Sequence, residues 1–141
     1  MIDSFEGSYE FLSNFYESSF TWRGTTYPTA EHAFQAAKTL DPIYRQAIIT
    51  ASTPGKAKRL GRAAVLRPDW EEVKDQIMYE VCKAKFTSNF YLLLALLATG
   101  DKEIIEGNTW GDTYWGVCNG EGQNKLGKIL MRLREELRDE V

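Results

Sequence analysis

The segment Thr29–Lys38 carries a carboxylate, an amide and an amine at spacings that bring them to one side of a helix. An α-helix advances about 100° per residue, so Glu31 and Lys38 nearly eclipse each other, with Gln35 between them. A carboxyl group can protonate a leaving base or activate water. A lysine whose pKa is lowered can attack a sugar carbon and form a Schiff base. This side of the helix is therefore a candidate catalytic surface.

The same spacing also fits an exposed helix face that does no chemistry. Glu, Gln and Lys placed three and four positions apart stabilise solvated helices, and surface pairs of this kind are common. Spacing alone favours this second interpretation. His32 lies beside the stripe, and a lone histidine is more often a hydrogen-bonded structural residue than a catalyst.

A second candidate feature is a cationic stretch. No Asp or Glu occurs from Pro42 to Pro68, although the whole chain has 20 acidic and 17 basic residues. Such asymmetry indicates a binding surface for phosphate or pyrophosphate, helped by free backbone N–H groups where a helix starts near Thr53. A solvated surface that pairs with acidic neighbours such as Glu71 explains the pattern equally well. The basic residues of the stretch are Arg45, Lys56, Lys58, Arg59, Arg62 and Arg67.

A third feature is the glycine- and tryptophan-rich segment Gly107–Gly116, which reads as a loop. Glycine lets backbone approach a ligand closely, and aromatic rings stack on a flat base or frame a ribose. Binding residues often lie on loops held by a rigid scaffold, so we interpret this loop as one wall of a pocket. Its candidates are the rings of Trp110, Tyr114 and Trp115 and the carboxylates of Glu106 and Asp112.

Asn14 is a weaker candidate. It lies in the polar pair Ser13–Asn14 within the aromatic string Phe11–Phe15. Its amide can hydrogen-bond the edge of a base or ribose, but an ordinary asparagine turn explains it as well.

The bulk properties limit the class of protein. The 141 residues, 43% of them hydrophobic, suit one domain over residues 1–141 with a real core. A net charge of -3 disfavours wide nucleic-acid or anionic-membrane contact. Two cysteines and one histidine make neither a disulfide framework nor a metal set, so we expect a reduced compartment, no metal and no cofactor.

Motifs for other chemistries are missing. There is no P-loop, no GxGxxG after a strand, no GxSxG, no HExxH and no CxxC. The N-terminus lacks the features of a signal peptide. The longest apolar run, Tyr91–Ala98, is far short of the roughly 20 residues that cross a bilayer. We therefore expect a cytoplasmic protein with no membrane contact.

The local patterns predict a mostly helical α+β protein with a few short strands. Phe20–Tyr27 reads as a hairpin with Arg23-Gly24 at its turn. The segment Gly100–Leu126 reads as one or two short strands with a long loop. Caps and apolar periodicity predict helices that start after Thr29 (Ala30–Leu40), Asp41, Thr53, Pro68-Asp69 and Asn89 (to Gly100), and a last helix with Leu126, Ile129, Leu130, Leu133 and Leu137 on one stripe.

Taken together, the sequence resembles the NADAR family, also called YbiA-like, nearly end to end. The most specific matches are Glu-His-x-Phe-Gln-x-x-Lys and Trp-Gly-Asp-x-Tyr-Trp-Gly. The matching strings lie at Phe5–Phe15, Tyr27–Lys38, Thr53–Arg62, Arg67–Trp70, Lys85–Phe86, Leu96–Asp101, Glu106–Gly116 and Gly122–Arg134.

The resemblance implies a YbiA-like fold and an N-glycosidase that cuts the bond between a ribose C1 and a nitrogen. One branch of the family acts on ribosylamino-pyrimidine phosphates of the riboflavin pathway, and another removes ADP-ribose from guanine in nucleic acid. A non-catalytic module that binds ADP-ribose or a nucleotide is the alternative. The resemblance names no protein partner.

The resemblance also implies roles for individual residues. Lys38 would be the Schiff-base nucleophile and Glu31 its acid/base partner, with Asp112 as a third catalytic residue. The residues expected to bind substrate are Asn14, Phe15, His32, Gln35, Arg62, Trp110, Tyr114, Trp115, Gly116 and Asn124.

Overall fold

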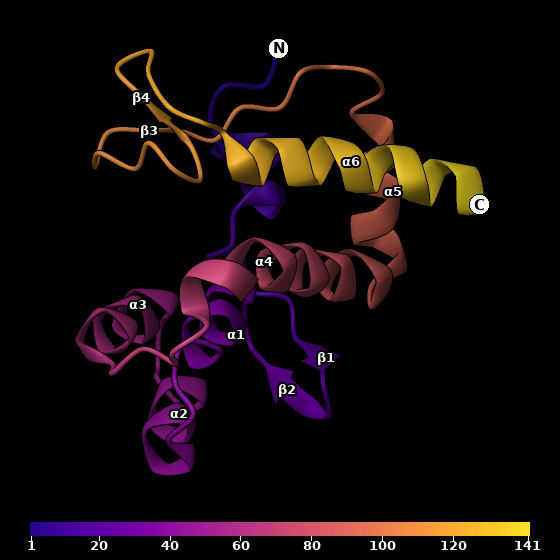
Figure 1. Ribbon diagram of the computed structural model, residues 1–141. Coiled ribbons are helices and arrows are strands. Elements are labelled where there is room, and N and C mark those ends of the chain that lie inside the picture. The colour runs from indigo at the N-terminus through magenta and orange to yellow at the C-terminus, as the bar shows by residue number, and fades with distance from the viewer. The chain divides into compact units, whose positions relative to one another are not determined.

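A computed structural model describes residues 1–141 (Figure 1). Contacts divide the chain into two compact units. We call Asn14–Ser88 the central unit, and Met1–Ser13 together with Asn89–Val141 the terminal unit. The expected class, a mostly helical α+β protein with a few short strands, is confirmed. The expected single domain over residues 1–141 stays a prediction.

The central unit consists of one hairpin and four helices. Its elements are β1 (Phe20–Trp22), β2 (Thr25–Tyr27), α1 (Ala30–Ala36), α2 (Pro42–Ile49), α3 (Pro54–Ala63) and α4 (Trp70–Thr87).

The hairpin forms as predicted. Phe20 pairs with Tyr27 in antiparallel register, and the turn residues Arg23 and Gly24 have φ of 50° and 80°. Two successive left-handed residues give the tight turn whose twist matches that of the strands. The hairpin is joined to α4, because Glu80 accepts hydrogen bonds from Trp22 Nε1 (3.3 Å) and Arg23 Nη2 (3.0 Å).

Three helix starts of the central unit follow the predicted caps. The Thr29 side chain accepts from the backbone N–H of His32, and the Thr53 side chain accepts from that of Lys56, both at 3.1 Å. The Asp41 carboxylate accepts from Ile43 N–H at 3.0 Å. Each acceptor satisfies a backbone donor that a helix start leaves without a partner, so these predictions are confirmed.

Helix α1 is shorter than predicted. It ends at Ala36 instead of Leu40, and Lys38 lies in the turn that follows. Arg45 of α2 takes over the exposed carbonyl end, because its Nε and Nη2 donate to the carbonyls of Ala36 (3.2 Å) and Thr39 (2.6 Å). These contacts come from a distant segment, which periodicity within the helix cannot reveal.

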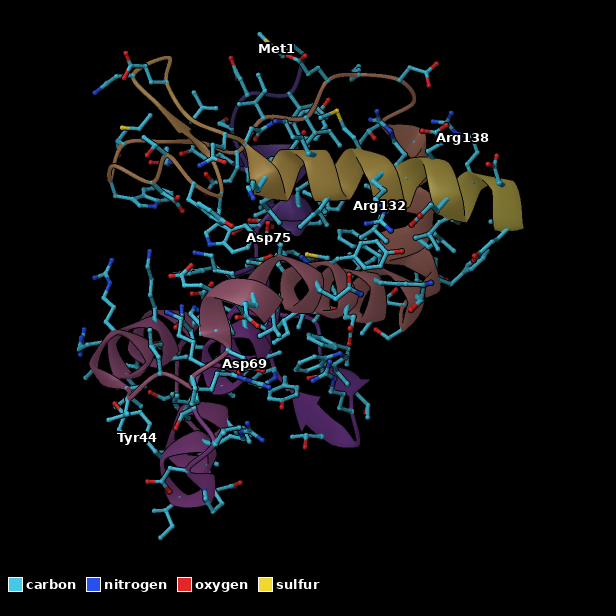
Figure 2. All side chains as sticks on the ribbon, viewed as in Figure 1. Met1, Tyr44, Asp69, Asp75, Arg132 and Arg138 are labelled. Carbon is cyan, nitrogen blue, oxygen red and sulfur yellow. The ribbon has the colours of Figure 1, made fainter.

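The other helices of the central unit pack against α1, which is buried along its whole length. Phe34 of α1 meets Trp70 of α4 with ring centroids 5.1 Å apart. Tyr44 of α2, labelled in Figure 2, donates from its hydroxyl to the Leu60 carbonyl of α3 at 2.6 Å. Side-chain contacts thus hold the helices around α1 together, and the Tyr44 contact also gives a hydrogen-bond donor to a carbonyl near the end of α3.

The terminal unit contains a short 3-10 helix that the sequence patterns did not predict. Its elements are η1 (Gly7–Leu12), α5 (Phe90–Ala98), β3 (Gly107–Asn108), β4 (Val117–Cys118) and α6 (Lys125–Glu140). The predicted Asn89 cap is confirmed, because its side chain accepts from Tyr91 N–H at 2.9 Å. The predicted stripe of α6 is buried at Leu126, Leu130, Leu133 and Leu137.

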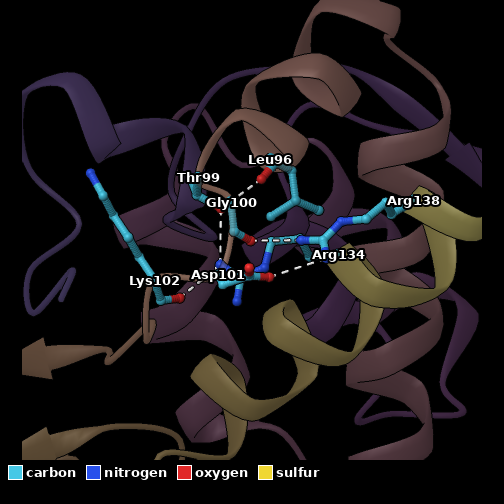
Figure 3. Close-up of polar contacts among 7 residues, drawn as sticks. All are labelled: Leu96, Thr99, Gly100, Asp101, Lys102, Arg134 and Arg138. Carbon is cyan, nitrogen blue, oxygen red and sulfur yellow. Dashed lines mark hydrogen bonds and ion pairs between the residues drawn. The ribbon is translucent and has the colours of Figure 1, made fainter.

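Two arginines of α6 bind the C-terminal end of α5 (Figure 3). Arg134 donates from Nη1 to the Thr99 hydroxyl (3.0 Å) and to the Lys102 carbonyl (2.7 Å). Arg138 donates to the Gly100 carbonyl at 2.7 Å and pairs with Asp101. Cations at a helix C-terminus satisfy its free carbonyls and oppose its dipole, so this pair fixes α5 against α6.

No single helix of the chain is both long and apolar enough to cross a membrane. Only α4 and α5 taken together, on either side of a sharp bend, reach the required length and composition.

Candidate active site

Glu31 is the acidic centre of the central unit. Its side chain is only 7% exposed, and its Oε1 accepts a 2.7 Å hydrogen bond from Gln35 Nε2. Burial raises the pKa of Glu31, while the Gln35 hydrogen bond and the charges of Lys58 and Lys38 lower it. Burial has the largest effect, so this carboxyl holds a proton more tightly than an exposed glutamate and is suited to general acid catalysis.

The interpretation of this helix side as an exposed stripe is wrong. Glu31 and Gln35 are both buried, as are Ala33 and Ala36 on the opposite side. The periodicity was ambiguous because α1 is short and surrounded by protein, so all its sides are buried.

Lys38 follows Glu31 by two helical turns and is half-buried. Its Nζ lies 5.9 Å from the ring centroid of Phe34. Burial lowers the pKa of Lys38, and the neighbouring cations Arg62, Lys58 and Lys74 lower it further, whereas Glu31 raises it. A lower pKa increases the fraction of neutral amine near pH 7, which is the nucleophilic form.

Three cations lie near Lys38 and form with it what we call the Lys38 cluster: Lys38, Lys58, Arg62 and Lys74. Lys58 and Arg62 project from α3 and Lys74 from α4. Lys58 Nζ also lies 5.9 Å from the ring of Phe15, and Lys74 pairs with Glu71. Several cations close together attract phosphate and bind its oxygens through charge-assisted hydrogen bonds.

Three of the four remaining cations of the predicted basic stretch have other uses, and the fourth, Arg59, is exposed. Arg45 binds the end of α1. Arg67 pairs with Asp69 through hydrogen bonds of 2.6 and 3.1 Å, and Lys56 donates to the Ser52 hydroxyl. The stretch therefore contains cations that are bonded within the protein, the exposed Arg59, and two of the four members of the Lys38 cluster, Lys58 and Arg62.

His32 has the structural role expected of a lone histidine. It is 1% exposed, and its Nδ1 lies 2.8 Å from the Thr29 hydroxyl while its Nε2 lies 2.9 Å from the Ala51 carbonyl. Both ring nitrogens are bonded within the protein. This geometry favours a structural role over the substrate contact expected from the motif.

Asn14 anchors the start of α1. Its carbonyl accepts from the Glu31 N–H at 2.9 Å. Its buried side chain donates to Met78 Sδ at 3.4 Å and accepts from Cys82 Sγ at 4.0 Å. Sulfur is a weak hydrogen-bond partner, so the amide keeps capacity for a stronger one.

Lys85 of α4 is a buried lysine that the sequence patterns did not identify as a candidate site residue. It is 1% exposed, and its Nζ lies 4.9 Å from the Phe86 ring and 5.7 Å from the Tyr16 ring. Burial lowers its pKa to about 8. The signal was present, because Lys85 continues the four-residue step of Ile77 and Val81 on the buried side of α4.

In the terminal unit, the loop Gly107–Gly116 is closed by an amide and a carboxylate. Asp112 Oδ1 accepts from the N–H groups of Tyr114 (3.1 Å) and Trp115 (2.9 Å). The Asp112 backbone is held in turn, because its N–H donates to Asn108 Oδ1 at 3.0 Å and its carbonyl accepts from Asn108 Nδ2 at 2.9 Å. Asp112 therefore orders the turn that presents the aromatic residues.

The rings of the loop are ordered but not buried. Tyr114 and Trp115 meet edge to face with centroids 4.8 Å apart, and Trp110 is 61% exposed. Neither tryptophan belongs to the core, which leaves both as candidates for stacking on a base.

Asn124 and Gly116 hold the base of this loop. Asn124 has a left-handed backbone (φ 52°), and its side chain accepts from Glu106 N–H and donates to the Ile104 carbonyl, both at 2.9 Å. At Gly116 a Cβ would overlap the Glu106 carboxylate and carbonyl. Both residues thus have structural reasons for their identity, besides the substrate contacts expected of them.

The structure assembles the expected residues in two groups. The central unit brings together Asn14, Phe15, Glu31, His32, Gln35, Lys38 and Arg62; the terminal unit brings together Trp110, Asp112, Tyr114, Trp115, Gly116 and Asn124. No three His, Cys, Asp or Glu side chains lie together as a metal site would require.

Comparison with known proteins shows the family and the fold of the chain. The model of the NADAR domain matches residues 3–138. N-glycosidase YbiA of Shigella flexneri serotype 5b is 45% identical over 129 residues, which are 89% of this chain and 80% of that protein. Riboflavin biosynthesis protein VVA0006 of Vibrio vulnificus is 39% identical over 92% of this chain and 36% of its own length. The NMR structure of the E. coli protein YbiA superposes with a TM-score of 0.87 at 41% identity, over 99% of this chain and 88% of that one.

Proposed function

Because this chain belongs to the NADAR domain family and is an N-glycosidase, we propose that it hydrolyses the ribose C1–N bond of a ribosylamino-pyrimidine phosphate from the riboflavin pathway. The resemblance read from the motifs and the YbiA-like fold are confirmed. The name of the Vibrio vulnificus relative, a riboflavin biosynthesis protein, supports this choice of substrate.

One observation carries the proposal. A buried carboxyl with a raised pKa and a half-buried amine with a lowered pKa interact within α1 and its following turn. Groups whose surroundings shift their pKa values toward each other are typical of acid/base and nucleophilic sites. The neighbouring cations Lys58, Arg62 and Lys74 supply charge for a phosphate.

The proposed reaction has two stages. In the first, Glu31 gives its proton to the glycosidic nitrogen and the neutral Lys38 amine bonds to C1, so that the C1–N bond breaks and the free amine of the base leaves. The bond between C1 and the ring oxygen then breaks, the ring oxygen takes a proton from the lysine nitrogen, and the lysine and C1 are joined as a protonated Schiff base. In the second, the Glu31 carboxylate takes a proton from water, which adds to C1. Glu31 passes that proton to the lysine nitrogen, and the C1–lysine bond breaks. The sugar leaves as an aldehyde that carries the oxygen of that water, and the proton of its hydroxyl returns to Glu31.

The terminal unit carries the aromatic loop, in which the rings of Trp110, Tyr114 and Trp115 have faces suited to stacking on a flat base. Asp112, which orders the turn, is proposed as a third catalytic residue through its carboxylate. Arg62 is assigned to the phosphate.

The deciding experiment is a hydrolysis assay read by mass spectrometry. The ribosylamino-pyrimidine phosphate and an oligonucleotide that carries ADP-ribosylated guanine are offered in separate reactions. We expect release of the free pyrimidine amine from the first substrate by the natural protein and no release by Lys38→Ala. Release of ADP-ribose from the oligonucleotide alone would replace the proposed substrate. Thermal stabilisation by either ligand without turnover would instead identify a nucleotide-binding module.

A further inference from the structure

The Gln35 side chain is the closest partner of Glu31, and its two amide atoms are in different situations. Nε2 donates the 2.7 Å hydrogen bond to Glu31 Oε1. Oε1 of the same amide is buried and has no hydrogen-bond donor in the protein. The whole side chain is only 4% exposed. A buried amide oxygen without a donor is destabilising, so an apolar side chain of the same shape would be more stable here.

We propose that Gln35 is a positioning residue whose amide pairs with Glu31 in both of its protonation states, by turning over when the proton arrives or leaves. This inference rests on the proposed acid/base role of Glu31. It replaces the substrate contact that the motif implied for Gln35.

The number of hydrogen bonds in the two protonation states of Glu31 supports the proposed turning of the Gln35 amide. When Glu31 is a carboxylate, it accepts from Nε2 and the amide oxygen has no partner, as the structure shows. When Glu31 carries the proton, its O–H can donate to the amide oxygen, which requires the amide to turn by half a rotation. Nε2 then occupies the position that Oε1 had. Each state has one hydrogen bond and one unpaired amide atom, so the amide favours neither state strongly. A cation in this place would favour the carboxylate, and an apolar residue the acid.

Gly61 of α3 leaves the room that the amide needs. A Cβ at this position would overlap Gln35 Oε1 and lie 2.7 Å from its Cδ. The last torsion of a glutamine is broad and roughly two-fold, so with no side chain at residue 61 the two amide orientations are close in energy. Any larger residue would press directly on the end of the amide.

The remaining charges that act on Glu31 come from two elements. Lys58 lies on α3, while Lys38 and His32 belong to α1 and its following turn, and all three favour the carboxylate. Burial opposes them and has the larger effect. These charges set the pH at which Glu31 titrates, whereas the Gln35 amide holds the Glu31 carboxyl in one orientation on both sides of that pH. The two-stage reaction requires this, because Glu31 first gives a proton and then takes one.

The test follows the two side chains by NMR, without reference to turnover. The Glu31 carboxyl carbon and the Gln35 side-chain NH₂ group are recorded in the substrate-free protein from pH 4 to 9. We expect the Gln35 NH₂ resonances to move with the same midpoint as the Glu31 carbon. Resonances of Gln35 that do not change while Glu31 titrates would overturn the inference, even if the enzyme hydrolyses the proposed substrate. If no substrate is hydrolysed, the coupled titration still decides the role of Gln35.

Two variants connect the pairing with the rate. Gln35→Met keeps the shape of the side chain and removes both amide atoms, and Gly61→Ala blocks the turn. We expect Gln35→Met to raise the Glu31 midpoint and Gly61→Ala to broaden the Gln35 response. Each should lower kcat by about 10- to 100-fold, within the range of acid/base catalysis, with KM changed less than about two-fold. Gly55→Ala, on the same helix with no crowding, is the matched control for Gly61→Ala. A raised KM with unchanged kcat in Gln35→Met would make Gln35 a substrate contact and overturn the inference.

Discussion

Arg45 Nη2 donates a 2.6 Å hydrogen bond to the carbonyl of Thr39, the residue after Lys38. Arg45 Nε reaches the Ala36 carbonyl at the end of α1 in the same way. The turn that carries the proposed nucleophile is therefore held by a side chain of α2. A residue of the basic stretch thus contributes to the site by orienting it, without facing a phosphate.

Arg45→Ala is expected to lose about 1.5–3 kcal/mol of unfolding free energy, the usual value of hydrogen bonds from a charged donor. Because the turn that carries Lys38 would then be held less firmly, kcat should also fall. Chemical denaturation with a steady-state assay measures both. Arg59→Ala removes an exposed cation of the same stretch and serves as control. Equal stability of the two variants would show that the Arg45 contacts add nothing.

Lys38→Ala is expected to stay folded and to lose hydrolysis by more than about 1,000-fold, as the loss of a nucleophile does. Borohydride should trap the sugar on the natural protein as a stable mass adduct and leave Lys38→Ala unmodified. Lys56→Ala, a change at an exposed lysine that contacts Ser52, should trap normally. A full adduct on Lys38→Ala would place the covalent bond on another lysine.

Glu31→Gln is expected to stabilise the protein at pH 8. Burial raises the pKa of Glu31 in the folded state above its value in the unfolded chain. Its contribution to stability is therefore fully present below the unfolded pKa of about 4.3 and is lost as the pH rises through the folded value. The variant has no such loss, so its advantage should be present at pH 8 and absent at pH 4.

Urea midpoints at the two pH values measure this effect. Glu72→Gln, at an exposed position of α4, should show no such pH dependence. If Glu31→Gln were less stable at pH 8, the carboxylate would be a net stabilising group, and its raised pKa would be contradicted.

Two variants of Asp112 distinguish its role in ordering the loop from its proposed role in catalysis. Asp112→Asn keeps an Oδ1 acceptor for the Tyr114 and Trp115 N–H groups and removes the charge. We expect near-natural stability and a kcat lower by about 100-fold. Asp112→Ala should also lose stability, by about 1 kcal/mol or more, since two backbone donors lose their acceptor. Full activity of the asparagine variant would make Asp112 a structural residue only.

Local chemistry determined the parts of the fold that could be predicted. The caps Thr29, Asp41, Thr53 and Asn89 act on backbone donors two or three residues away, and the Arg23-Gly24 turn depends on two adjacent φ angles. Each signal lies inside the element it defines, so the sequence contains it in full.

The missed features depend on partners far along the chain. Helix α1 ends early because Arg45 binds its Ala36 carbonyl and the backbone N–H of Arg67 binds the Lys38 carbonyl in the turn that follows. The burial of Glu31, which gives it acid/base character, comes from packing of other helices. Motif resemblance placed Glu31 and Lys38 at the proposed site, whereas helical spacing alone pointed to solvent. Spacing reports which residues share a side of a helix and not what covers that side.

The first N–H groups of α6 are bonded to the aromatic loop, with Lys125 N–H 3.2 Å from the Tyr114 carbonyl and Leu126 N–H 2.9 Å from that of Trp115. These anchors use main-chain carbonyls, which any residue supplies, and Lys125 Nζ adds a side-chain contact 4.6 Å from the Tyr114 ring centroid. The backbone attachment of the loop is therefore the same whichever rings it carries. Mutation can replace Tyr114 or Trp115 without releasing the backbone, so substrate preference can diverge during evolution at little cost in stability, whereas Gly107 and Gly116 must both stay small.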